Sequence, residues 1–121
     1  MTFSGFQLTA ILKLAKAMVF ADGKVTAEES VILVSEFSRF GVPSDNFNVM
    51  LNESDKMKAS EALAIVASLT NSQKKHVCGY LAAVMTADGV DETELALWSF
   101  ISTIAQLPTM TIQEAVEFWA K

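Results

Sequence analysis

Several features are scarce or absent in this chain of 121 residues, and each absence narrows the class of protein. The single cysteine, Cys78, rules out a disulfide within the chain, which fits a reducing compartment. The N-terminal segment lacks a basic n-region, and Lys13 and Lys16 interrupt its apolar run, so we expect a folded helix there rather than a signal peptide. No apolar run approaches the ~20 residues of a membrane span, so we expect no membrane insertion and a cytoplasmic location.

Positive charge is also scarce. Nine Lys and Arg residues stand against fourteen Asp and Glu residues, and the net charge is −5. The basic residues are scattered, with Lys74 and Lys75 the only adjacent pair, so nucleic-acid binding is not expected. An acidic surface suits solubility, cation binding or a basic partner. Hydrophobic residues make up 51%, which indicates one globular domain with apolar surface left for an unknown protein partner or for a second copy in a homodimer.

Apolar residues recur at helical spacing nearly everywhere, and no stretch alternates with the period of two typical of a strand. We therefore expect an all-α fold, a single bundle of about seven helices. The expected helices cover residues 8–19, 27–40, 44–51, 62–69, 72–86, 92–104 and 112–119. The polar residues 52–57 are expected to form a turn, and Ser44 to cap the third helix.

Two of the expected helices carry apolar stripes that define their buried faces. In the second helix the stripe is Val31, Val34, Phe37 and Phe40. In the sixth helix the stripe is Leu97, Trp98, Ile101 and Ile104. In the fifth helix we expect Val77, Tyr80, Leu81, Val84 and Met85 to point inward.

One sequence unit occurs twice. The segment FADGKVTAEE (20–29) is echoed by TADGVDETE (86–94), and EFSRFGVP (36–43) by ISTIAQLP (101–108). In each copy a helix ends at Asp-Gly, a capped helix follows, and a proline comes after it. We interpret the chain as a single domain, 1–121, with repeat halves at about 6–43 and 72–108 related by a pseudo-twofold axis. Two copies are too few for a solenoid.

These paired Ala-Asp-Gly hairpins resemble the tellurite-resistance TerB-like family over nearly the whole chain. The resemblance implies an all-α fold with pseudo-twofold repeats, an association with stress, and no established enzymatic activity. It also implies a metal site built from acidic residues. In this sequence the matching positions are Asp22, Glu29, Asp88 and Glu94. Oxygen ligands of this kind suit a divalent cation such as Ca²⁺ or Mg²⁺.

Helix capping offers a simpler explanation for the same carboxylates. Glu29 lies three residues after Thr26, and Glu94 three after Asp91, which is the spacing of a capping box. Asp22 and Asp88 precede the glycines, outside that geometry, and are the better ligand candidates. A complete EF-hand is excluded, because with Gly23 at the sixth loop position the first and third positions are Met18 and Phe20, which offer no side-chain oxygen.

Other residues that invite a functional interpretation have structural explanations. His76 and Cys78 are two residues apart on one helix and point in different directions, which disfavours a zinc site or a catalytic pair. Trp98, Trp119 and the six methionines suit the core or a partner surface. Paired carboxylates can perform acid–base chemistry, but no nucleophile or phosphate-binding motif accompanies them.

The sequence therefore predicts a non-enzymatic binding or adaptor module that acts through acidic residues at its two Asp-Gly turns, with a divalent cation as the candidate ligand. The alternative is a metal-free interaction domain that docks partners on an apolar helix face bearing Met and Trp.

Overall fold

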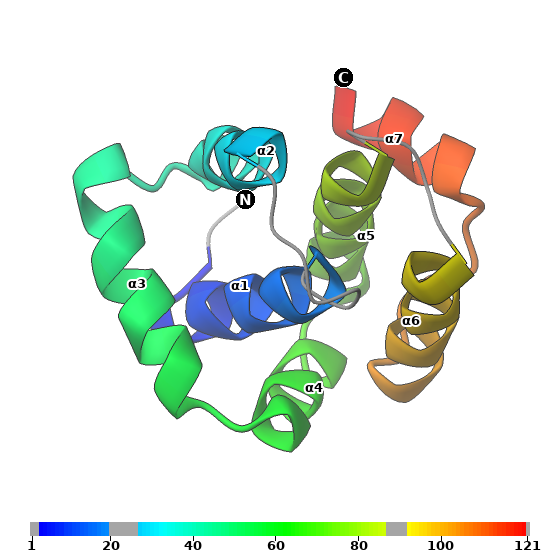
Figure 1. The fold of residues 1–121 in the computed structure, drawn as a ribbon. Helices are drawn as coiled ribbons and strands as arrows, with labels where there is room; N and C mark the ends of the chain where they lie inside the picture. The colour runs from blue at the N-terminus through cyan, green and yellow to red at the C-terminus, as the bar shows by residue number, and fades with distance from the viewer. Residues whose placement is uncertain (1–2, 20–26, 87–91, 121) are drawn as a thin grey trace.

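The computed structural model describes residues 3–19, 27–86 and 92–120, and within these ranges the chain forms seven α-helices, one 3₁₀ turn and no strand (Figure 1). The all-α bundle of seven helices expected from the sequence is confirmed. The elements are α1 (Gly5–Val19), α2 (Ala27–Phe37), η1 (Ser38–Phe40), α3 (Ser44–Lys56), α4 (Ala59–Ala67), α5 (Asn71–Thr86), α6 (Glu92–Ile104) and α7 (Ile112–Ala120).

Helices α1 and α5 lie at the centre and are packed against each other (Figure 1). α3 and α4 pack mainly on α1, whereas α2 and α7 pack on α5. The central position shows in the burial of α1, where Ala10, Ile11, Leu12, Ala15 and Met18 have no exposed surface. The five residues of α5 expected to point inward are all buried as well. The core is thus built around two helices from opposite halves of the chain.

An aromatic cluster fills the space where α2, α5 and α7 meet. Tyr80 is completely buried, with ring centroids 5.7 Å from Phe37, 5.3 Å from Phe40 and 5.9 Å from Trp119. Each such ring pair contributes roughly 0.5–1.5 kcal/mol beyond the burial of its area. The Tyr80 hydroxyl donates a 2.9 Å hydrogen bond to the Leu33 carbonyl, so its one polar group is satisfied. Burial, with a smaller contribution from Glu36, raises the pKa of Tyr80 well above its usual value.

Two charged side chains fasten the end of α7 to α2 and η1. The Trp119 indole N–H donates to a Glu36 carboxylate oxygen. Arg39 donates to the Trp119 backbone carbonyl, and its guanidinium lies over the indole, 4.6 Å from the ring centroid. The carbonyls of a last helical turn have no partner within the helix. Arg39 therefore both caps α7 and covers its tryptophan.

Reciprocal side-chain caps begin three of the helices. Ser4 and Gln7 cap α1, Thr70 and Gln73 cap α5, and Thr111 and Glu114 cap α7 in the arrangement of a capping box. The last of these has the capping-box spacing in the sequence, with Glu114 three residues after Thr111. The backbone N–H of Thr111 lowers the pKa of Glu114 because it stabilises the carboxylate form.

The expected turn at residues 52–57 is wrong, because α3 continues to Lys56. Ser54 is completely buried on the inner side of this helix and donates its hydroxyl to the Leu51 carbonyl, and Asp55 forms an ion pair with Lys16 of α1. These polar residues therefore continue the helix, because Ser54 bonds to the backbone of its own helix and Asp55 pairs with a lysine of the neighbouring helix. Ser44 is also not the cap: it begins α3, and Pro43 precedes the helix without a side-chain hydrogen bond.

The expected buried stripes are wrong at two positions. Val31 is 63% exposed, because α2 turns Leu33 and Phe37, one helical turn apart, toward the core instead. Ile104 is 47% exposed, because α6 is covered on one side only and buries Ile101 alone among its own residues.

The interpretation of a duplicated unit stays a prediction, although one pair of matched positions shares an unusual backbone conformation. Gly41 follows η1 with φ 89°, and Gln106, its counterpart in the second copy, follows α6 with φ 55°. Within the described residues they are the two positions with positive φ. Both lie two residues before a proline.

We predict that Gly79→Ala destabilises the protein by about 1–3 kcal/mol, the cost of overpacking a core. A Cβ at Gly79 would lie 2.7 Å from the Trp119 Cβ and 3.3 Å from the Ala115 carbonyl oxygen. Gly5→Ala is the matched control, because a Cβ there meets nothing within 4 Å. Urea unfolding measures both. Equal stability of the two variants would contradict the close approach of α5 and α7.

Candidate functional site

The four carboxylates expected at a cation site are described only in part. Asp22 and Asp88 lie outside the described residues. Glu29 belongs to the first turn of α2, but its side chain is not described. Glu94 lies in the first turn of α6 and is half-buried. Among the side chains that are described, no three His, Cys, Asp or Glu residues are grouped closely enough to hold a metal ion. Convergence of the four carboxylates therefore stays a prediction.

His76 and Cys78 occupy separate surroundings on α5. The His76 ring packs edge-on against Phe118, 5.1 Å between centroids, and its Nδ1 lies 2.9 Å from the Ser72 carbonyl oxygen. Cys78 is completely buried, and burial raises the pKa of its thiol to about 11. A thiol with that pKa is protonated at neutral pH and is a poor nucleophile. Cys78 is therefore part of the core.

The most exposed apolar surface belongs to α6. Six large apolar side chains are exposed in the described part of the chain, and three of them are on this helix: Leu95 (43%), Phe100 (54%) and Ile104 (47%). Phe100 and Ile104 are one helical turn apart and share one edge of the outward face. A helix with this much apolar surface toward solvent is typical of a contact site.

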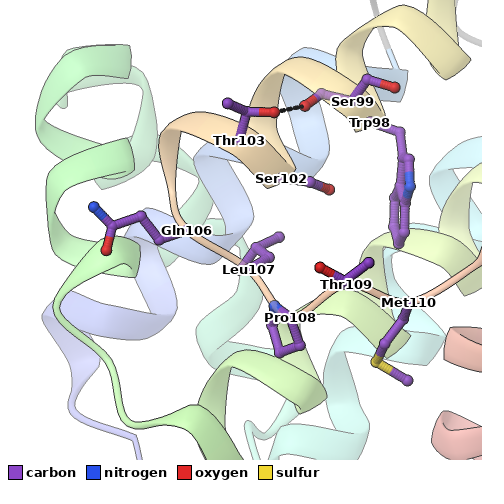
Figure 2. A pocket seen from close by; sticks show the side chains of 9 residues that line it. All are labelled: Trp98, Ser99, Ser102, Thr103, Gln106, Leu107, Pro108, Thr109 and Met110. Atoms are coloured by element: carbon purple, nitrogen blue, oxygen red, sulfur yellow. Dashed lines mark hydrogen bonds between the residues drawn. The ribbon is translucent and has the colours of Figure 1, made fainter.

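A hollow of about 460 Å³ adjoins α6 where the helix ends and the chain turns toward α7 (Figure 2). Trp98 stands at one edge of the hollow and Gln106 at the opposite edge, while Thr109 and Met110 lie between them and α7 (Figure 2). Its other lining residues are Ser99, Ser102, Thr103, Leu107 and Pro108. No charged side chain lines it. An aromatic wall with hydroxyl and amide groups around it suits a side chain or a backbone segment of a protein ligand.

Gln106 adopts a backbone conformation that favours glycine. The Leu107 N–H bonds to the Ser102 carbonyl (2.9 Å) and the Gln106 N–H to the Thr103 carbonyl (3.3 Å), so α6 ends in a Schellman motif with Gln106 as the left-handed residue. That conformation costs a residue with a Cβ roughly 1–2 kcal/mol. At the matched position the first half has Gly41. Strained residues of this kind cluster at functional sites.

The net charge of the chain falls entirely in its second part. Residues 1–75 contain eight Lys or Arg and eight Asp or Glu, whereas residues 76–121 contain one lysine and six acidic residues, which leaves −5. That lysine is the last residue, so residues 76–120 contain no Lys or Arg. Four of the acidic residues lie on α6 and α7: Glu92, Glu94, Glu114 and Glu117. The two helices that adjoin the hollow, α6 and α7, therefore carry acidic side chains and no Lys or Arg.

Most of this surface was not predicted from the sequence. Trp98 and the methionines, which include Met110, were expected in the core or on a partner surface, and Ile104 on a buried stripe, whereas Phe100 was not singled out. Apolar and polar residues are interspersed around α6. The spacing of the apolar residues therefore did not show which side of the helix its neighbours would cover.

The fold and this surface define a seven-helix all-α domain with one exposed apolar helix, and none of its described helices is long and apolar enough to cross a bilayer. The chain is similar in sequence and fold to a protein of unknown function from Porphyromonas gingivalis W83, known from a crystal structure. The two are 46% identical with a TM-score of 0.91, over 100% of this chain and 92% of that one. The chain belongs to the same family as that protein. No protein-family model and no curated protein matches it.

We predict that Gln106→Gly stabilises the protein by about 1 kcal/mol, because glycine adopts the left-handed conformation without a Cβ penalty. The reciprocal variant Gly41→Gln should lose a similar amount, since nothing lies within 4 Å of a Cβ there and only the φ of 89° opposes it. Thermal or urea unfolding of both variants checks the pair. A Gln106→Gly variant that is no more stable than the parent would show that Gln106 is not strained.

Proposed function

We propose that this protein is a non-enzymatic binding or adaptor module of the TerB-like type, and that it binds a segment of a partner protein on α6. The observation that carries the proposal is the exposure of Leu95, Phe100 and Ile104 on a single helix beside the Trp98 hollow. The alternative interpretation from the sequence, docking on an apolar face with Met and Trp, agrees with Trp98 and Met110 at that hollow. We also propose a cytoplasmic location, on the basis of the sequence features, and a stress-related role, on the basis of the resemblance to the TerB-like family.

Electrostatics favours a protein segment over the other macromolecules that bind apolar or groove-shaped surfaces. Nucleic acids and anionic membranes both require basic groups, and α6 and α7 have none. A homodimer formed through the same face of α6 would bring two acidic surfaces together, with no Lys or Arg on α6 or α7 to offset the repulsion. A partner protein with a different sequence needs no basic groups on α6 or α7. It can also supply groups that complement the acidic and apolar side chains of α6, so no like charges are brought together.

We predict that helical peptides selected from a phage-displayed library bind the parent protein and lose at least about tenfold in affinity for Phe100→Ser/Ile104→Ser, because both apolar contacts are removed. Val49→Ser is the matched control, since Val49 is 60% exposed on α3. Circular dichroism confirms folding of each variant, as substitutions at exposed positions usually change stability little. Selected peptides that bind the double variant as tightly as the parent would refute docking on α6.

The cation remains a second proposal, supported by the duplicated Asp-Gly turns of the sequence. Calorimetric titration of Ca²⁺, Mg²⁺ and Mn²⁺ into chelator-treated protein should give saturable heat that disappears in Asp22→Asn/Asp88→Asn. Carboxylates that act only as turn or capping groups predict no heat in either protein. That result would remove the cation and leave docking on α6 unaffected.

A further inference from the structure

We infer that the occupant of the α6 surface is a basic amphipathic helix, with Lys or Arg residues beside an apolar stripe. The inference rests on the docking function proposed above and specifies the chemistry of its partner. Two features of the described residues lead to it: the order of acidic and apolar side chains along α6, and the absence of Lys and Arg from α6 and α7.

Carboxylates lie on α6 itself and on α7, the two helices that adjoin the hollow. Glu92 is exposed in the first turn of α6, before Leu95 and Phe100. On α7, Glu114 accepts a hydrogen bond from the N–H of Thr111, which directly follows Met110 of the hollow. From residue 92 to residue 106 the surface extends roughly 20 Å at 1.5 Å per residue. A partner helix of about four turns matches that length.

The carboxylates are available to a partner. Glu92, Glu114 and Glu117 are all exposed, and none of these three takes part in a salt bridge with another described residue. By contrast, Glu53, Asp55 and Glu36 in the first part of the chain are each paired with a Lys or Arg. A basic partner would therefore gain interactions that the protein does not already make. The contribution of these ion pairs to the affinity should fall as the salt concentration rises, because salt screens exposed charges.

The test uses the strongest binder from the helical library. Its Lys and Arg residues are replaced by Gln in one synthetic peptide and by Glu in another, while its apolar residues are kept. Fluorescence anisotropy with the full chain at low salt should show at least about tenfold weaker binding for the Gln peptide and weaker binding still for the Glu peptide. The difference should shrink toward 1 M salt.

Variants of the protein test which carboxylates are responsible for the preference for a basic peptide. Glu92→Gln/Glu114→Gln should reduce the preference for the basic peptide over the Gln peptide severalfold, and Gln at position 114 keeps the capping-box chemistry. Asp45→Asn/Glu61→Gln is the matched control, because both residues are also first-turn acids, on α3 and α4. The control should leave the preference unchanged.

Two results would overturn the inference. Selected peptides without an excess of Lys and Arg over the starting library would show that the partner is not basic, as would equal affinity for the three charge forms. In either case docking on α6 still stands if binding requires Phe100 and Ile104. Binding that ignores those two residues would instead refute the docking function itself.

Discussion

The close approach of α5 and α7 at Gly79 is the contact on which the rest of the arrangement depends. Since Gly79 has no side chain, Trp119 packs directly on α5 and joins the aromatic cluster around Tyr80. Glu36 of α2 and Arg39 of η1 then bind the same residue, so Trp119 joins α2, α5 and α7, which are distant from one another in sequence. With α2 and α7 on α5, and α3 and α4 on α1, α6 receives the least cover and keeps an apolar outer face.

The energies involved indicate what kind of binding this face can support. Burying a large apolar side chain completely is worth about 1.5–3 kcal/mol, and Phe100 and Ile104 are each about half-exposed. Their burial would therefore supply roughly 1.5–3 kcal/mol, whereas a micromolar complex needs about 8 kcal/mol. The remainder must come from the hollow beside Trp98 and from charge. A surface of this kind suits reversible association, which is what an adaptor requires.

Periodicity was sufficient to predict the helices, because apolar spacing and side-chain caps such as Thr111 with Glu114 act locally. It failed where a tertiary contact decided the outcome. Ser54 and Asp55 read as turn residues but continue α3, because Ser54 is buried inside the bundle and Asp55 pairs with Lys16 of α1. The exposure of Ile104 also followed from helix placement, which no single segment encodes. The site predicted at the Asp-Gly turns rested on repetition in the sequence, whereas the surface found on α6 arises from incomplete cover.

The central claim is that α6 packs less extensively on the domain than the other helices and that a basic partner helix binds its exposed face. Hydrogen–deuterium exchange tests it directly, first on the free protein and then with the selected basic peptide bound. The account predicts the lowest protection in α6 and the highest in α1 and α5 for the free protein, and a rise in protection of α6 on binding. Protection of α6 equal to that of α5 in the free protein, or a rise confined to other helices, would contradict it.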